Sequence, residues 1–564
     1  MKTYDQRMEA VLKKAKSRKI VRTCLKTTTT VMCILAVIIG IMHIPYGSIN
    51  AGVSPTNGNT HPTNPTNRPT HPPGWIDPSP VGSTSPADPT EVISVNIWML
   101  DEGMARFTHA QIDRFNQINT LGIAIDATIE WADAYVSADY IAQDVENAPD
   151  LYCFRQDDLM RLVDLNALTP LGDSDAQWVK ENNLSFNVDT ATYDDQVFAF
   201  PLSYQNAMLL YYDRSVISDE DAKSLTKVLS ACEAADKKFC FETESVESIF
   251  TFFLATGCNS QWYPDAAGNY TEVVDTLNSK EGRFALLGML DILNSPVRTT
   301  VVRNGMSSNT IMEEVYRQCG AVISFSTNGI VELAFGDNLG ITVLPTFEQY
   351  DSTYQLHSFA DSIMMGIKPQ ENARKAVVLA ELAKFLTGEE CQLERYERIY
   401  WMVPSNTAAL EQLSQEEPLI AAMVEQSQYV VPNMLPHVTE WWDIARDIVE
   451  RFENDLTNEM TLKLYAQRLE DMLDPPTGIW SVHDGYLDID MVEQPDGTWR
   501  TKEPLYLSEK DGFIIRYEHS YDQACYQKTE FGSSYWKPGV AGYYHIFFDP
   551  AAWQCTWELQ SQQE

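Results

Sequence analysis

The strongest constraint on the fold is a change of hydrophobic periodicity that starts at Val92. The segment VISVNIWML is a mostly apolar run typical of a buried strand, MARFTHAQIDRFNQIN repeats apolar residues at helical spacing, and IAIDATIEW is again strand-like. APDLYCF predicts a third strand, with a helix around residues 157–165 after it. Alternating strands and helices are typical of parallel strands joined by crossover helices. The sequence therefore predicts an α/β architecture with a largely parallel sheet.

This pattern continues too far for a single sheet. The segments CGAVISFS and GITVLPTF are strand-like, and ENARKAVVLAELAKFLTG and WWDIARDIVERFEND are helical, so the pattern extends to about Leu473. The chain has 564 residues, whereas one compact domain usually has about 100–200. We therefore expect two lobes within residues 91–475.

The amino end predicts a membrane anchor. Residues 1–26 carry nine Lys and Arg, and residues 27–46 open with about 18 uncharged residues, close to the shortest length that spans a bilayer. Positive charge before the span predicts a cytoplasmic tail at 1–26 and an extracellular body. The long basic region and the lack of a clear A-x-A site favour a retained signal anchor. A cleaved leader stays open as the alternative. Cys33 lies inside the span rather than just after it, unlike the cysteine of a lipoprotein.

Residues 47–90 differ in composition from both of their neighbours. The run PTNGNTHPTNPTNRPTHPPGWIDPSPVGSTSPADPT is dominated by Pro, Thr, Asn and Ser. It has too few apolar side chains to offset the entropy of ordering, and its prolines favour extended polyproline II. We expect a disordered stalk that holds the folded part away from the membrane.

Charge and motif content argue against several functions. The net charge of −38 gives a surface that repels phosphates, so we expect no nucleic-acid partner. The ten cysteines form no CxxC pair and no zinc-like cluster, and we expect no metal and no cofactor. Free buried thiols are expected, but pairing of Cys232 with Cys240 and of Cys525 with Cys555 stays open. The sequence has no P-loop, no HExxH and no GxSxG, so we expect no enzyme activity.

Seven segments of the body follow one another in a recognisable order. They are VNIWML…FTHAQIDRFNQ, APDLYCFRQDDLMRLVDLNALTPL, YDDQVFAFPLSYQNAMLLYYDRSVI, CGAVISFSTNGIVEL, GITVLPTF, FADSIMMGIKPQENARKAVVLAELAKFLTGEECQ and PNMLPHVTEWWDIARDIVERF. Over about 380 residues this order resembles the extracellular solute-binding proteins of ABC importers, in the maltose and oligosaccharide-binding cluster. The resemblance implies two α/β lobes joined by a hinge, a ligand in the cleft between them, and closure that presents a shape to a permease.

The resemblance also implies ligand contacts made by aromatic faces and by planar polar groups that bind sugar hydroxyls. Trp442, in TEWWDIARDIV, falls where maltose-like members place a stacking tryptophan, and Trp441 beside it is a second candidate. The alternative for this pair is a place in the core. Asp101 and Asp157 follow the first and third strands, where relatives carry hydroxyl-binding carboxylates and where loop residues often meet ligands. The alternative for Asp101 and Asp157 is that they are acidic residues on solvated loops with no ligand contact.

Three further positions are candidates by their place in the resemblance. Phe154 stands where the family often has a stacking aromatic on the third strand. Gln205 lies near the lobe crossing, where maltose binders have a glutamate, and Asn328 lies where they have a second stacking tryptophan. These departures weaken the case for maltose itself, so peptides, polyamines and metals stay open as ligands.

After residues 475–476 the character changes to short aromatic strands and turns. Residues 476–564 include Pro495-Asp496-Gly497, a hairpin signal, and AGYYHIFFDPAAWQCTWEL, a hairpin that turns near residues 549–550. The order D-I-D-M…DGTW…PLYL…DGFIIRYEHSYDQ…AGYYHIFFDP…TW is similar to starch-binding β-sandwich modules, although the glycine of their S-W-D-x-N-x-G run is missing. We expect a small antiparallel β-sandwich, and its aromatics either form a second glycan site or belong to the core. The candidates are Trp480, Trp499, Tyr521 and Trp536.

Together these features predict a membrane-anchored, extracellular, monomeric solute-binding protein. It would capture a carbohydrate, such as a maltodextrin, by cleft closure and deliver it to ABC permease subunits. The alternative is a tethered cell-surface receptor or adhesin that holds glycan without a transporter, which the retained anchor and the extra β-module favour. The sugar, its linkage and its chain length do not follow from the sequence.

Overall fold

The computed structural model describes the body and the C-terminal region of the chain. The described residues are 91–560 apart from 244, 265–269, 302–308, 400–401, 434–440, 442–443, 446–448, 450–451, 453–456, 486, 510–511, 526 and 530–531. The predicted cytoplasmic tail, signal anchor and stalk lie outside these residues. Within the described part, no helix is both long enough and apolar enough to cross a membrane.

The first lobe is built on a mixed sheet with the strand order β17-β16-β3-β1-β2, and β6 also pairs with β16. β1 pairs in parallel with both β2 and β3, which confirms the parallel strands predicted from the periodicity. β16 runs antiparallel to β3 and β6, and all ten of its residues are buried. The strands are β1 (Glu91–Met99), β2 (Ile123–Trp131), β3 (Leu151–Arg155), β6 (Ala199–Gln205), β16 (Ser358–Ile367) and β17 (Val430–Pro432).

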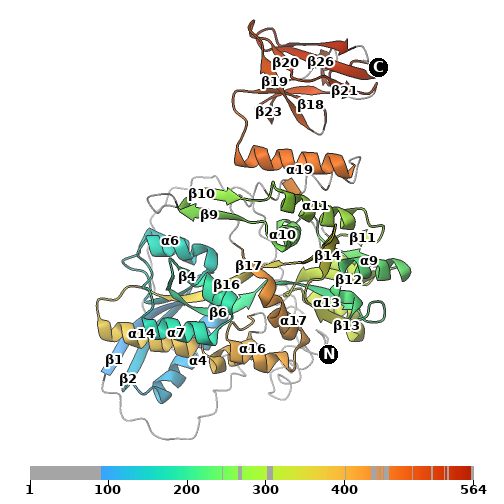
Figure 1. Ribbon diagram of the computed structural model, residues 1–564. Helices are drawn as coiled ribbons and strands as arrows, with labels where there is room; N and C mark the ends of the chain where they lie inside the picture. The colour runs from blue at the N-terminus through green and yellow to red at the C-terminus, as the bar shows by residue number, and fades with distance from the viewer. Residues whose placement is uncertain are drawn as a thin grey trace.

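Helices pack against this sheet (Figure 1). α4 begins where the carboxylate of Asp101 accepts a hydrogen bond of 2.8 Å from the backbone N–H of Met104, an N-cap. The helices predicted around 157–165 and over ENARKAVVLAELAKFLTG are confirmed as α6 and α14. The helices of this lobe are α4 (Glu102–Ile118), α5 (Ser137–Gln143), α6 (Leu159–Asp164), α7 (Asp173–Asn182), α8 (Ser185–Thr190), α14 (Ala373–Leu386) and α15 (Glu389–Arg398).

The second lobe has its own sheet, with the order β11-β8-β12-β7-β13. β8 pairs in parallel with β11 and β12, whereas β7 runs antiparallel to β12 and β13. The strands are β7 (Met208–Asp213), β8 (Lys238–Cys240), β11 (Arg298–Thr299), β12 (Cys319–Phe325) and β13 (Leu339–Thr342). Its helices include α9 (Leu225–Ala234), α10 (Val246–Ala255), α11 (Lys280–Leu293), α12 (Asn309–Tyr316), α13 (Gly329–Phe335), α16 (Thr407–Ser414) and α17 (Pro418–Gln426).

Up to β17 the chain passes between the two lobes four times. The chain leaves the first lobe at residues 206–207, between β6 and β7, and returns through residues 343–357, between β13 and β16. After α15 it enters α16 and α17, which pack with β7 and β12, and β17 then rejoins β16 in parallel. The sheet of the second lobe is therefore inserted within the sequence of the first.

The C-terminal region is an antiparallel array with the order β21-β26-β20-β19-β18-β22-β23, and β27 pairs with β26. Residues 488–490 of β19 pair with β18 and residues 491–493 pair with β20, so the two expected sheets are one continuous array folded around an apolar core. Both predicted hairpins are confirmed, as β19–β20 and β26–β27. The strands are β18 (Trp480–His483), β19 (Asp488–Glu493), β20 (Trp499–Thr501), β21 (Leu505–Leu507), β22 (Ile514–Tyr517), β23 (Ser520–Cys525), β26 (Gly542–Asp549) and β27 (Gln554–Gln560).

Helix α19 (Asn458–Leu473) connects this array to the second lobe (Figure 1). Its Leu462, Tyr465 and Leu469 are buried in the apolar core of the second lobe. From the same helix, Gln467 donates a hydrogen bond of 2.6 Å to the carbonyl of Asp488 and accepts one of 2.9 Å from its backbone N–H. One helix thus packs into the core of the second lobe and is hydrogen-bonded to the C-terminal array.

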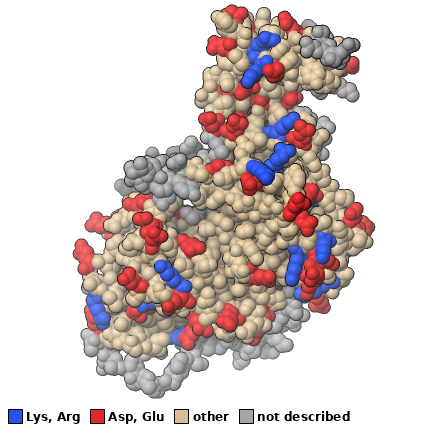
Figure 2. Space-filling model, viewed as in Figure 1, with Lys and Arg blue, Asp and Glu red and all other residues tan. Residues whose placement is uncertain are grey.

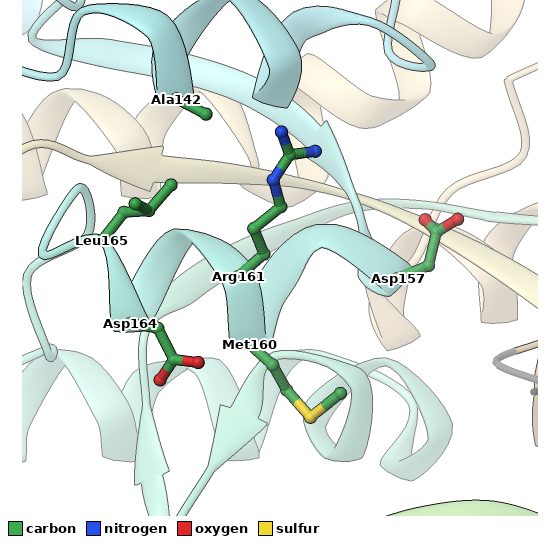
Figure 3. Close-up of a pocket in the computed structure, with 6 residues that line it drawn as sticks. All are labelled: Ala142, Asp157, Met160, Arg161, Asp164 and Leu165. Carbon is green, nitrogen blue, oxygen red and sulfur yellow. The ribbon is translucent and has the colours of Figure 1, made fainter. Parts of the chain in front are cut away.

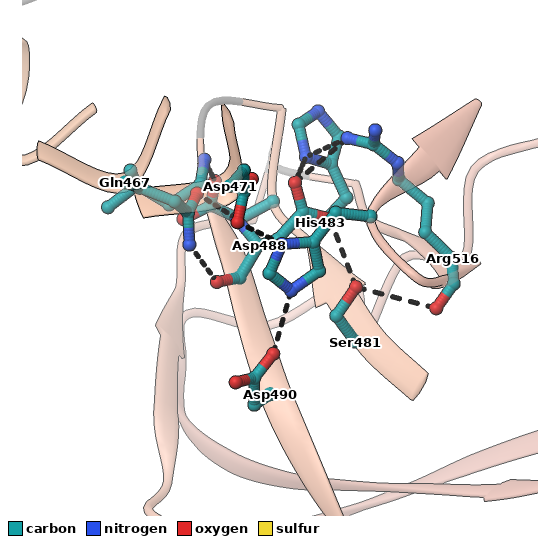
Figure 4. Close-up of polar contacts among 10 residues, drawn as sticks. Gln467, Asp471, Ser481, His483, Asp488, Asp490 and Arg516 are labelled. Carbon is teal, nitrogen blue, oxygen red and sulfur yellow. Dashed lines mark hydrogen bonds and ion pairs between the residues drawn. The ribbon is translucent and has the colours of Figure 1, made fainter. Parts of the chain in front are cut away.

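A buried ionic network lies at this junction (Figure 4). Arg516 Nη1 donates to Asp488 Oδ2 at 2.9 Å, and Ser481 Oγ donates to Asp488 Oδ1 at 3.0 Å. Burial opposes ionisation of Asp488, but the hydrogen bond with His483 and the charge of Arg516 lower its pKa. The network is enclosed, because the side chains of Arg516 and Asp488 are 2% and 1% exposed. It therefore fixes the strands that face α19.

His519 completes the junction from a turn in left-handed backbone. Glu518 and His519, between β22 and β23, have φ of 52° and 53°. The imidazole of His519 bonds to Asp471 of α19 at 2.9 Å and to Asp490 of β19 at 2.7 Å. Burial alone would lower the pKa of His519, but the hydrogen bonds with Asp471 and Asp490 raise it to about 9. The protonated ring thus bridges two carboxylates from different elements.

The eight described cysteines are free thiols. Neither Cys232 with Cys240 nor Cys525 with Cys555 is bonded, and burial raises the pKa of Cys525 to about 12. The remaining two, Cys24 and Cys33, lie outside the described residues.

We predict that the junction loses stability between pH 6.5 and 9.5. The folded-state pKa of His519 lies above its usual 6.5, so its contribution is complete below pH 6.5 and is lost as the pH rises through about 9. Scanning calorimetry should show the unfolding temperature of the C-terminal region falling over this window, and H519Q should flatten that slope. H545Q, which removes another buried histidine of the array, should keep it. A slope that survives in H519Q would contradict the prediction.

Candidate ligand-binding site

The first polar group at the hinge lies at the end of β3. Arg155 ends that strand, and its guanidinium lies 4.3 Å from the centre of the Tyr135 ring, 3.1 Å from Asp157 and 3.6 Å from Asp361. Burial opposes the charge of Arg155, but the two carboxylates outweigh it and raise the pKa of the guanidinium. The ring of Tyr135 is 64% exposed, so a fixed cation supports one face of an accessible aromatic side chain.

Asp361, in the middle of the hinge, accepts hydrogen bonds from several segments. Gln156 Nε2 donates to its Oδ1 at 3.2 Å, and Asn206 Nδ2 donates to its Oδ2 at 2.6 Å. Asn206 lies on the first crossing and has a left-handed backbone with φ of 58°. Thr327, which follows β12 of the second lobe, donates to Asn206 Oδ1 at 3.5 Å. A chain of polar contacts therefore runs from the first lobe through the crossing to the second.

The second lobe contributes further groups to the same place. The backbone N–H of Ser326, just after β12, donates to the carbonyl of Ala207 on the crossing at 2.8 Å. Glu247 opens α10, and burial, with the nearby charge of Asp361, raises its pKa. The carboxyl ends of β3 and β12 thus meet at the crossing, the position at which α/β folds bind ligands.

Exposed aromatic side chains gather on the loop after β2 and on α5. Trp131 and Tyr140 are exposed like Tyr135, and Tyr140 makes an edge contact with Trp98, with ring centres 6.5 Å apart. Trp98 Nε1 donates to Glu130 Oε2 at 3.1 Å. Sequence reasoning missed this loop, although its signal was present: Trp131 ends a strand parallel to β1, and the residues ADAY directly follow it.

The predicted polar residues have different positions in the structure. Asp157 is half exposed and paired with Arg155 at the hinge. Gln205 ends β6 and is buried opposite Asp361. Asp101 is engaged as the N-cap of α4. Asn328 caps α13 and donates to Tyr316 and Ser324, at 3.0 and 2.8 Å. Gln205 therefore lies beside Asp361 and Asp157 is linked to it through Arg155, whereas Asp101 and Asn328 serve helix ends.

The predicted stacking aromatics of the body are core residues as far as they are described. Phe154 has no exposed surface, because β3 lies inside the sheet and its ring packs on Tyr152 at 5.9 Å. Trp441 is 1% exposed and packs against Phe250, with ring centres 4.9 Å apart. Trp442 lies outside the described residues.

The aromatic candidates of the C-terminal array are mostly packed. Trp536 is buried against Phe513, and Trp499 is half-buried beside the core. Trp480 is half-buried against Tyr517, Phe548 and Trp553, and the side chain of Tyr521 is outside the description. More accessible rings occur at Trp553, Tyr506 and Tyr543, none of which the sequence singled out.

A shallow pocket of about 490 Å³ lies beside the hinge on the first lobe (Figure 3). Asp157 lies at one side of it, and Arg161 and Asp164 of α6 are among the other lining residues. Burial and the charge of Asp157 raise the pKa of Asp158 to about 6. No group of His, Cys, Asp and Glu suited to a metal occurs in the described part of the chain. Acidic side chains are scattered over the visible face of the molecule (Figure 2).

We predict that D361A destabilises the body by about 3 kcal/mol, because it leaves the buried Arg155 and two amide donors without their acceptor. D157A should cost less than about 1 kcal/mol, since Asp157 is 47% exposed and its ion pair with Arg155 is screened by solvent. Urea unfolding of both variants measures the difference. Equal effects would contradict the central role of Asp361.

Comparisons with known proteins agree with this architecture. A profile of the bacterial extracellular solute-binding protein family matches residues 110–422, more than half of the chain. A maltodextrin-binding protein from L. casei BL23, solved without ligand, is similar with a TM-score of 0.54 and 18% identity, over 68% of this chain and 98% of that chain. No curated protein gave a significant match.

Two ligand-bound structures are also similar. A cyclo/maltodextrin-binding protein complexed with maltotetraose has a TM-score of 0.54 and 16% identity, over 68% of this chain and 97% of that chain. The maltose-binding periplasmic protein of Listeria monocytogenes in complex with maltose has a TM-score of 0.53 and 15% identity, over 68% of this chain and 98% of that chain. At identities this low, the similarity to the solved structures shows the fold alone. Family membership is shown by the profile match over residues 110–422. The chain belongs to the family of bacterial extracellular solute-binding proteins.

Proposed function

We propose that this protein captures a carbohydrate, an oligosaccharide of the maltodextrin kind, between its two lobes. The observation that carries the proposal is the polar chain from Arg155 through Asp361 and Asn206 to Thr327, which links both lobes at the carboxyl ends of their strands. A ligand that contacts both ends of this chain changes the spacing of the lobes, which is how hinge closure reports occupancy.

The side chains at the hinge suit a neutral sugar. Tyr135 offers an exposed aromatic face for sugar C–H groups, and the half-exposed Asp157 offers a planar carboxylate for hydroxyls. The similar structures that hold maltose and maltotetraose support this ligand class. An exposed tyrosine stacked on an arginine also presents a rigid surface, because the guanidinium is held by two carboxylates.

Delivery to ABC permease subunits is the activity that fits the family best, and no catalytic role is proposed. In this proposal residues 27–46 anchor the chain, residues 47–90 form the stalk, residues 91–475 bind the ligand and residues 476–564 form the β-module. The folded body is extracellular.

A tethered glycan receptor without a transporter is the second candidate. The observation in its favour is the fixed junction at α19, which holds the β-module against the second lobe through Gln467, Asp471 and the buried Asp488 network. The exposed Trp553, Tyr506 and Tyr543 of that module would meet a second part of the same glycan.

We predict that maltotetraose raises the unfolding temperature of the intact chain, purified in a mild detergent, because a ligand that binds only the folded state stabilises it. Calorimetric titration should show binding about tenfold weaker in Y135A, or about 1.4 kcal/mol, through loss of the stacking face. Y350A, which removes another exposed tyrosine far along the chain at the β14 (Thr346–Gln349) to β15 (Ser352–Gln355) turn, is the matched control. A shift with a peptide or a polyamine but with no sugar would refute the carbohydrate proposal.

A further inference from the structure

A second shallow pocket, of about 430 Å³, lies on the first lobe where α4, α7 and α14 come together (Figure 1). Ile118 at the end of α4, Trp178 of α7 and Phe385 of α14 line it, together with the loop at residues 119–121. Ile118 is 48% exposed, and the side chains of Trp178 and Phe385 are half-buried. None of the lining residues belongs to the hinge, so sugar capture leaves this pocket without a role.

Two aromatic rings of the pocket are held in place from behind. The ring of Phe385 packs on the buried ring of Phe115, with centres 5.4 Å apart. The ring of Trp178 packs on the buried ring of Phe200, with centres 6.1 Å apart. Both rings therefore present a fixed surface at the pocket, which an occupant meets without a loss of side-chain entropy from the protein.

Polar side chains of the pocket are already paired within the protein. Asn119 Nδ2 donates to two backbone carbonyls, at 3.0 and 3.1 Å. Lys384 is paired with Asp175 at 2.9 Å and also with Glu381. An occupant thus gains contact chiefly with ring faces and aliphatic carbon. A polyol, whose hydroxyls need polar partners, suits such a place less well than an apolar segment of polypeptide does.

The chain enters the folded body beside this pocket. Glu91, the first described residue, pairs with Ile123 across the parallel strands β1 and β2, and Ile123 lies two residues after Leu121 of the lining loop. Arg374 of α14 donates to the carbonyl of Leu121 at 2.9 Å and to Glu91 Oε2 at 3.4 Å. One arginine therefore joins the start of β1 to the rim of the pocket.

Helix α14 leads from this arginine to the pocket. Glu381, a lining residue, follows Arg374 by two helical turns, or about 10 Å along the axis. Val377 lies between them at the spacing that places all three on one face of the helix, and it is 51% exposed. An exposed apolar side chain thus lies on the path from the start of β1 to the pocket.

The segment just before the body has the chemistry for this pocket. Residues 69–80, PTHPPGWIDPSP, contain five prolines together with Trp75 and Ile76. Proline is apolar and has no backbone N–H that needs an acceptor, and Pro-rich segments in polyproline II dock in aromatic-lined grooves. Ten residues, 81–90, separate this segment from Glu91. In polyproline II ten residues span about 31 Å, more than the path along α14 requires.

We propose that residues 69–80 dock in the pocket between α4, α7 and α14 of the same chain, with Trp75 and Ile76 against the rings of Trp178 and Phe385. Because the segment is tethered nearby, its effective concentration is of millimolar order, and a contact with a dissociation constant of about 0.1 mM is about nine-tenths occupied. This inference goes beyond ligand capture and does not depend on it. Docking leaves residues 47–68 as the spacer and orients the body by its first lobe.

Chymotrypsin measures this docking, because Trp75 is the sole aromatic residue among residues 47–90. In the intact chain, purified in a mild detergent, cleavage between Trp75 and Ile76 should be about tenfold slower in wild type than in I118D, which places a charge on the pocket wall. Mass spectrometry of the fragment that begins at Ile76 gives the rate. V492D is the matched control and should match wild type, since Val492 is also 48% exposed but lies on β19 of the C-terminal array.

A second variant keeps the test independent of folding. T120R fills the pocket from its exposed loop, and it replaces I118D if that variant loses the wild-type unfolding temperature. Cleavage that is equally fast in wild type and in the pocket variants overturns the docking, and so does slow cleavage that the variants leave unchanged. Slow cleavage of wild type that accelerates on dilution shows that a second copy fills the pocket, which overturns docking within one chain. Sugar capture stands under each of these outcomes.

Discussion

The arrangement of the two lobes depends on one buried carboxylate, that of Asp361. It lies in β16, a strand with no exposed residue, and a charge in such a place is stable only with good partners. Those partners are Arg155 at the end of β3, Gln156 just after it and Asn206 on the crossing. The hydrogen bonds and the ion pair that stabilise the Asp361 carboxylate therefore fix the end of β3 and the conformation of the crossing at residues 206–207.

The same carboxylate also holds the backbone of the crossing at Asn206. Asn206 tolerates left-handed backbone because its short amide can bond locally, and here it bonds to Asp361 on one side and to Thr327 on the other. An apolar residue in place of Asn206 would remove both the hydrogen bond to Asp361 and the one from Thr327. The hinge thus combines these hydrogen bonds with apolar packing, because one buried cluster includes Tyr204 and Ala360 of the first lobe, Ala207 of the crossing and Leu209 of the second.

Periodicity was sufficient to predict the elements but not the site. The strands β1 to β3, the helices α4 and α14 and both C-terminal hairpins follow from local apolar spacing and turn residues, which act over a few positions. Burial within a sheet is a long-range property, and it explains why Phe154 and Trp441 are core side chains. Asp361 gave no signal, since SFADSIMMGI shows only a buried strand with an acid in it. Tyr135 could have been found by applying to β2 the rule that was applied to β1 and β3.

The insertion of the second lobe within the first has a consequence for synthesis and export. β1, β2 and β3 emerge early, but β16, which pairs with β3, lies more than 200 residues later, behind the whole sheet of the second lobe. Until Ile367 has left the ribosome or the membrane channel, β3 keeps an unpaired edge and Asp361 has not reached the side chains of Arg155 and Gln156. Contacts of such long sequence separation form slowly, and exposed edges of sheets attract other chains. A nascent chain of this topology therefore needs protection for as long as the second lobe is being made.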